Sequence, residues 1–177
     1  MTHDGRAEWI AEALARYETP LLRFATKLLR DGDRARDIVQ ETFLQLCQQP
    51  RADVEGHLAA WLFCVCRNRA LDLRRKETRV ETLTETAAAD PQAGPSEVAQ
   101  HREDATHIMK ILETLPESQQ EAVYLRFQSG LSYKEIAEVT GRTVSNVGVL
   151  LHAAVTAIRA QLAHTAQPRA RLGEGSR

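Results

Sequence analysis

The 177-residue sequence has little of several features that define common protein classes. Aromatic residues make up only 5% of it, which argues against a large aromatic-rich β-sandwich. Its three cysteines are an odd number and too few for a disulfide framework, which indicates a reducing compartment. The longest apolar run, Leu58 to Cys66, has nine residues and is too short to span a bilayer. The first residues lack the basic-then-apolar order of a signal peptide, so we expect a soluble cytoplasmic protein without a membrane span.

The formal net charge of -1 conceals an uneven distribution along the chain. Residues 9–80 hold 13 basic and 10 acidic side chains, whereas residues 81–107 hold one basic and six acidic ones. Residues 108–165 hold five of each sign. A basic block followed by an acidic stretch is typical of proteins with a nucleic-acid partner, so the low net charge does not exclude one.

Apolar residues recur with helical spacing along most of the chain, and no segment alternates as a strand would. The spacing predicts helices from Trp9 to Leu29 and from about His57 to Lys76, with another between them. Pro20 predicts a start or a kink within the first helix. The expected inward faces carry Ile38, Val39, Thr42, Phe43, Leu46 and Cys47 on the second helix and Leu58, Trp61, Leu62 and Val65 on the third.

The helical pattern breaks in a polar, acidic stretch that contains Pro91, Gly94 and Pro95. We therefore predict an all-α protein made of two small helical domains, over residues 9–80 and 108–165. A flexible acidic linker over residues 81–107 joins them. The tail over residues 166–177 contains proline and glycine and is expected to be disordered.

The second domain carries the spacing of a helix-turn-helix. Ser132 and Glu135 form a capping box that starts a short helix. Ala137 is small enough for two helices to cross, and Gly141, four positions later, allows a tight turn. Val147, six positions further on, is expected to face the core from the second helix of the motif. The opposite face of that helix would then enter the major groove of DNA.

The groove-facing side chains are expected to be polar rather than basic. No lysine or arginine lies between Val144 and Ile158, although phosphate neutralisation supplies most of the affinity for DNA. Other phosphate ligands must therefore contribute, among them the backbone amides of Ser145 and Asn146. The candidate DNA-binding residues of this domain are Arg126, Lys134, Arg142, Thr143, Ser145, Asn146, Val149 and His152.

The end of the third helix is strongly basic. Six lysines and arginines fall within residues 67–79, close to the aromatic residues Trp61 and Phe63 and to the amide of Asn68. Cations with aromatic neighbours suit melted or single-stranded DNA, whose bases need stacking platforms. A solvated helix face is the simpler interpretation of a basic run taken alone.

Three segments, in this order, resemble the extracytoplasmic-function (ECF) sigma factors of bacterial RNA polymerase. They are Asp37 to Leu44, Trp61 to Arg75, and Leu115-Pro116 followed by Gly130 to Ala137. The resemblance implies a protein that binds core RNA polymerase, recognises the −35 and −10 promoter elements and promotes transcription initiation. It also implies that the acidic linker mimics nucleic acid in polymerase channels, and it makes an anti-sigma factor a plausible partner.

The resemblance assigns roles to particular residues. Asp37, Gln40, Glu41 and Phe43 match the motif that docks on the clamp coiled coil of the polymerase. Arg67, Asn68 and Asp72 match the motif near the −10 element, and Arg74, Arg75 and Lys76 match the basic stretch that meets the DNA backbone. The chain departs from the family in the second domain, where Gly148, Leu150 and Ala153 stand at positions at which many members have lysine or arginine.

Two other functions remain possible on the sequence. One is a helix-turn-helix regulator that binds duplex DNA on its own, usually as a dimer. The other is a thiol-based sensor or enzyme built on Cys47, Cys64 and Cys66, although cysteine as a small apolar filler explains these residues more simply. Because no catalytic constellation, phosphate-binding glycine loop or metal-ligand spacing is evident, we expect a protein that is not an enzyme and needs no cofactor or metal.

Overall fold

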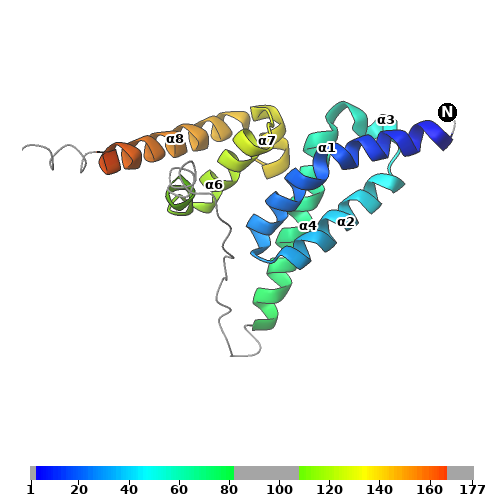
Figure 1. Cartoon of the computed structure of the whole chain (residues 1–177), viewed down its shortest axis with the longest axis horizontal. Helices are drawn as coiled ribbons and strands as arrows, with labels where there is room; N and C mark the ends of the chain where they lie inside the picture. The colour runs from blue at the N-terminus through cyan, green and yellow to red at the C-terminus, as the bar shows by residue number, and fades with distance from the viewer. Residues whose placement is uncertain (1–2, 82–107, 167–177) are drawn as a thin grey trace, which may run out of the picture.

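The computed structural model describes residues 3–81 and 108–166, which are helical and contain no strand. The first domain consists of α1 (His3–Leu29), α2 (Gly32–Gln48), the short α3 (Arg51–Val54), the 3-10 turn η1 (Glu55–His57) and α4 (Leu58–Glu81) (Figure 1). The predicted all-α class is confirmed. The predicted linker, except for its first residue, and the tail beyond residue 166 lie outside the described residues.

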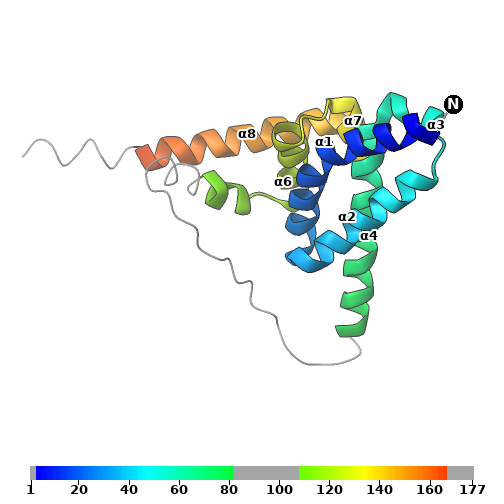
Figure 2. The same cartoon turned by 45° about the vertical axis from the view of Figure 1, so that its right-hand side comes forward.

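The second domain begins with a helical segment over residues 108–113. It continues with α6 (Glu117–Val123), the π-helical η2 (Tyr124–Gln128), α7 (Tyr133–Thr140) and α8 (Val144–Ala166). Helix α6 starts directly after Pro116, whose fixed φ suits a helix start. The two domains lie against each other, with α7 of the second packed on α4 of the first (Figures 1 and 2).

Helix α1 runs through Pro20 without ending. It changes direction part-way along its length, as both views show (Figures 1 and 2). Proline removes one backbone donor and its ring clashes with the carbonyl one turn earlier, so a bend is the expected response. Of the two outcomes that Pro20 allowed, the kink is therefore the one observed.

Helix α2 is capped at its start by Asp31 and has most of the predicted buried face. The Asp31 carboxylate accepts hydrogen bonds from the backbone N–H groups of Asp33 (2.9 Å) and Arg34 (3.1 Å), which caps the helix. The face that packs inward carries Ile38, Val39, Thr42, Phe43 and Leu46. Cys47 was expected on the same face but is exposed, since it lies at its edge near the end of the helix.

The buried face of α4 is rotated from the predicted one. Leu62 is fully buried as expected, but Leu58, Trp61 and Val65 are only partly buried. The other fully buried side chains of the helix are Ala60, Phe63, Cys66 and Ala70, and Phe63 meets Phe24 of α1 edge-on at 5.4 Å. Helix α4 packs against α1, α2 and α7, so contacts from three sides rather than one set its buried stripe.

The helix-turn-helix is confirmed in its details. Ser132 and Glu135 form both hydrogen bonds of the capping box, at 2.7 and 3.3 Å. Gly141 adopts a φ of 67°, which allows the Arg142 N–H to donate to the Ala137 carbonyl at 3.0 Å and closes the turn. The buried side chains of α8 are Val147, Leu151 and Ala154.

The segment before the helix-turn-helix is not a single α-helix. Residues Tyr124–Gln128 form a π-helix, which ends at Gly130 in the left-handed conformation at a φ of 71°. The Leu131 N–H donates to the Leu125 carbonyl at 3.0 Å across this ending. Gly130 thus follows the end of the helical segment in the left-handed conformation, and the wider π turn precedes it.

Helix α8 is apolar enough over Val144–Ala163 to meet the length and composition of a membrane span, with a mean hydropathy of 1.2. The sequence predicts no span when only uninterrupted apolar residues are counted. Ser, Asn, Thr and His residues interrupt the apolar run of α8, but they are uncharged and leave its mean hydropathy high. A core helix of a globular domain passes the same test. Since Val147, Leu151 and Ala154 pack in the core of the second domain, this one helix is weak support for a span.

Candidate nucleic-acid interface

The C-terminal half of α4 presents a basic surface. The side chains of Arg74 and Arg75 are 43% and 78% exposed, and Lys76 is exposed beside them. Among residues 3–81 and 108–166, the one ion pair of Arg75 is a 3.4 Å contact with Asp72 of its own helix, so its charge is available to a partner. Asn68 is exposed on the same helix. These positions, predicted to meet DNA, are thus accessible in the structure.

Arg67 is the exception among the predicted −10 residues. Its side chain is only 18% exposed and forms an ion pair with Glu121 of α6, in the other domain. The Arg67 Nε donates to Glu121 Oε1 at 2.6 Å, and Nη2 donates to Oε2 at 3.3 Å. In this conformation the Arg67 guanidinium faces a carboxylate and not solvent.

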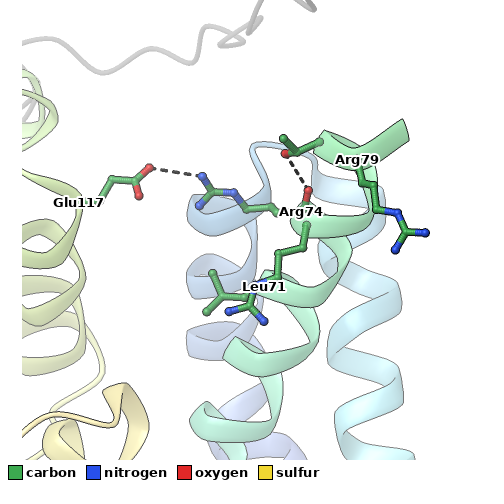
Figure 3. Close-up of a pocket in the computed structure, with 6 residues that line it drawn as sticks. Leu71, Arg74, Arg79 and Glu117 are labelled. Carbon is green, nitrogen blue, oxygen red and sulfur yellow. Dashed lines mark hydrogen bonds and ion pairs between the residues drawn. The ribbon is translucent and has the colours of Figure 1, made fainter. Parts of the chain in front are cut away.

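A cleft between α4 and the start of α6 continues the basic surface. Glu117 of α6 points across it toward Arg74, with 3.4 Å between Oε1 and Nη2 (Figure 3). Arg79 also lines the cleft, although it was not among the predicted site residues. Its place at the end of the same basic run was the signal that could have found it. The cleft is lined by Leu71, Arg74, Arg75, Thr78, Arg79 and Glu117.

The exposed face of α8 carries the predicted groove-facing residues. Ser145, Asn146 and His152 are exposed, and Val149 is 64% exposed. The Thr143 hydroxyl accepts a hydrogen bond from the Asn146 N–H at 3.2 Å and so caps the helix. Because this bond uses the Asn146 amide, that amide is not free for a phosphate in this conformation.

The cations around α8 are exposed but not equally free. Lys134 lies on the surface at the start of α7, and Arg142 lies on the surface in the turn of the motif. Arg126 donates from Nη1 to the Leu131 carbonyl at 2.9 Å, and its guanidinium stacks on the Tyr133 ring at 5.5 Å. Arg126 thus stabilises the loop before α7. Tyr133 is 42% exposed beside Gly148 of α8, a neighbour that sequence analysis missed because it depends on how the two helices cross.

The predicted polymerase-docking residues on α2 divide into exposed and buried side chains. Asp37 and Gln40 are exposed. Glu41 is exposed as well and forms an ion pair with Arg69 of α4. Phe43 is only 6% exposed and packs in the core of the first domain, so its assignment to polymerase docking stays a prediction that rests on the family motif. Its neighbour Leu44, which was not predicted, is 62% exposed.

The cysteines occupy three different environments. Cys66 is buried, and burial raises the pKa of its thiol to about 12, which keeps it protonated. Cys64 is partly buried and Cys47 is exposed. Only Cys66 therefore fits the expected role of an apolar filler fully. Within residues 3–81 and 108–166, no three His, Cys, Asp or Glu side chains come together as metal ligands would.

Two domain families match the chain at the two domains just described. The profile of sigma-70 region 2 matches residues 13–80, and that of sigma-70 region 4 matches residues 107–158. The first match covers the helices that carry the basic surface, and the second covers the helix-turn-helix. The fold and the candidate site thus define a two-domain protein of the sigma-70 class.

Relatives of known name narrow this class. The chain is 35% identical over 131 residues to the ECF RNA polymerase sigma factor EcfG of Rhodopseudomonas palustris, covering 72% of this chain and 71% of the relative. It is 33% identical over 146 residues to the ECF sigma factor SigL of Mycobacterium tuberculosis, covering 80% and 82%. The sigma factor RpoE of Bartonella quintana, solved in complex with the anti-sigma factor NepR, is 26% identical and superposes with a TM-score of 0.62, covering 91% of this chain and 98% of that one. The chain belongs to the ECF RNA polymerase sigma factors, which act in transcription initiation.

Proposed function

We propose that this sigma factor binds core RNA polymerase through the exposed face of α2 and contacts promoter DNA through α4 and α8. Asp37, Gln40 and Glu41 are the docking residues on α2. The C-terminal half of α4 binds the −10 element, and the exposed face of α8 binds the −35 element. The protein acts as a positioning subunit in the cytoplasm and not as a catalyst.

The observation that carries this proposal is that α4 and α8 expose side chains of different chemistry. Helix α4 offers exposed cations whose ion pairs, Arg74–Glu117 and Arg75–Asp72, are long and solvent-exposed. The exposed face of α8 instead offers amide, hydroxyl, imidazole and methyl groups. Cations neutralise phosphates, and the α8 groups can distinguish base edges in the major groove. One domain thus supplies affinity and the other supplies selectivity.

Neither domain is expected to bind a promoter tightly alone. Because no lysine or arginine lies between Val144 and Ile158, α8 has few counterions to release on binding DNA. When polymerase holds both modules on one DNA molecule, the second contact becomes intramolecular and its effective concentration rises. The same lack of cations disfavours a regulator that binds duplex DNA without polymerase. The raised pKa of Cys66 likewise disfavours that thiol as a reactive group.

The polymerase contact can be tested by reversing one charge. Asp37 is exposed and makes no ion pair within the described residues, so Asp37→Arg changes the surface without removing an internal contact. We expect Asp37→Arg to lose binding to core polymerase in a pull-down while its helical circular dichroism stays unchanged. Glu12→Arg makes the same charge change on the exposed face of α1 and is expected to bind normally. Normal binding by Asp37→Arg would remove α2 from the interface.

A further inference from the structure

The second domain covers part of the DNA-binding helix of the first. Four side-chain contacts cross between the domains around α6 and η2, and Arg74–Glu117 in the cleft is one of them. The Lys27 Nζ of α1 donates to the Gln120 side-chain oxygen at 2.9 Å, and the Phe24 and Tyr124 rings lie 5.8 Å apart. Arg67 of α4 pairs with Glu121, which lies between Gln120 and Tyr124 in the sequence. Side chains of α6 and η2 therefore contact α1 and α4 of the first domain.

The Arg67–Glu121 pair differs from the other ion pairs of the described residues in its burial. Its side chains are 18% and 11% exposed, whereas both partners in every other pair within residues 3–81 and 108–166 are at least 34% exposed. Two hydrogen bonds join the guanidinium fork to the two carboxylate oxygens. Such bidentate pairs are strong and directional, and breaking one that is buried leaves an uncompensated charge.

A carboxylate and a phosphate present the same geometry to an arginine. Both offer paired anionic oxygens that accept from the guanidinium fork. Glu121 thus occupies the guanidinium donors with which Arg67 would meet a phosphate near the −10 element. We propose that Glu121 acts as an internal substitute for a DNA phosphate, so that the free sigma factor is closed and Arg67 becomes available to promoter DNA only when α6 leaves α4.

A second carboxylate on the same helix supports this arrangement. Glu117 lies one turn before Glu121 and reaches toward Arg74 across the cleft (Figure 3). Its side chain is 81% exposed and the contact is 3.4 Å long, so this pair is weak and solvent-screened. The acidic side of α6 therefore covers the basic side of α4 with one buried pair and one loose pair. This difference makes Glu117 a natural control for Glu121.

The closed interface contains features that make it able to open. The Tyr124 hydroxyl is buried without a hydrogen-bond partner among the described residues. Burial at the same interface lowers the pKa of Lys27, which means that the charged amine is poorly solvated there. Both features raise the free energy of the closed form, because opening returns these groups to water. Helix α7 also packs on α4, so the Arg67–Glu121 ion pair is one of several contacts that hold an interface with unsatisfied polar groups elsewhere.

The inference rests on the proposed role of α4 in DNA binding, but closure itself can be measured without DNA. Small-angle X-ray scattering of the free, full-length chain gives its radius of gyration. We expect Glu121→Gln to have a larger radius of gyration than the wild type, and Glu117→Gln to match the wild type. An unchanged radius for Glu121→Gln, with unchanged helical circular dichroism, would overturn the proposal.

A charge exchange keeps the test decisive if Glu121→Gln fails to fold. The single changes Arg67→Glu and Glu121→Arg each place two like charges together and are expected to open the chain. The double change restores an opposite pair and is expected to recover the compact radius. A double variant as expanded as the single variants would show that this pair does not hold the domains together.

DNA binding by the free chain then tests the consequence of closure. With a fluorescent single-stranded 20-mer of mixed sequence, we expect Glu121→Gln to bind about tenfold more tightly than the wild type, since a larger fraction is binding-competent. Glu117→Gln is expected to stay within about twofold of the wild type. An opened Glu121→Gln with wild-type DNA affinity would refute masking by Glu121. Transcription by wild type with core polymerase, measured in parallel, reports on the proposed function independently of closure.

Discussion

Replacing Arg75 and Lys76 by glutamine tests whether α4 supplies affinity through DNA phosphates. Both side chains are exposed, and Arg75 has only a 3.4 Å intrahelical pair to lose, so the change should not disturb the fold. Arg75 lines the cleft but its ion pair is with Asp72 of its own helix, and Lys76 is not among the cleft-lining residues, so the change removes no ion pair between the domains. The affected quantity is the dependence of promoter affinity on salt.

The size of the effect follows from counterion release. Each phosphate contact contributes about 0.7 to the slope of log affinity against log salt for single strands, and about 0.9 for duplex DNA. Loss of two contacts should therefore make the slope shallower by about 1.4 to 1.8. Between 50 and 200 mM salt, this slope change corresponds to a relative affinity change of roughly tenfold.

The assay is promoter binding by the complex of this chain with core polymerase, titrated at several salt concentrations. Arg16→Gln/Arg23→Gln removes the same charge from exposed positions on α1 and serves as the control. We expect the control to keep the wild-type slope. If the α4 variant also keeps that slope, the DNA path does not follow the C-terminal half of α4, and the reasoning fails.

Two further predictions concern stability. Ser132→Ala removes the capping-box acceptor of the Glu135 N–H and should lower the unfolding free energy of the second domain by about 1 kcal/mol in urea titration; no loss would mean that the cap adds nothing to the motif. Burial raises the pKa of Tyr124 to about 12, above its usual value near 10, so the folded state holds this proton more tightly than the unfolded state does. The stabilisation is complete below about pH 10 and is lost as pH rises toward about 12. The unfolding temperature should therefore fall over this range in the wild type and fall less in Tyr124→Phe. An equally steep fall in the variant would contradict the burial of the phenol.

The helix-turn-helix was predictable because its signals are local. The Ser132 cap, the turn at Gly141 and the inward Val147 lie within 16 residues, and each acts through its own backbone conformation or its nearest turns. The second domain therefore follows from the sequence almost residue by residue. The π-helix over Tyr124–Gln128 is different, since the ordinary helix formers there carry no distinguishing signal.

The environment of the first domain's site residues was harder to predict because it depends on distant partners. Arg67 and Glu121 are 54 positions apart, and only the packing of α6 on α4 brings them together. Phe43 matches a family motif, but the orientation of α2 turns it into the core and leaves Leu44 on the surface. The inward face of α4 rotated for the same reason, since α7 packs on the helix from the second domain.

The central claim is that this chain directs core RNA polymerase to promoters, and in vitro transcription from a mixed promoter library tests it most directly. Reactions with core polymerase alone and with added protein would be compared by mapping transcript start sites. We predict discrete new start sites that share two upstream sequence elements at a fixed spacing. A folded, polymerase-bound chain that yields no new start site across the library would contradict the account.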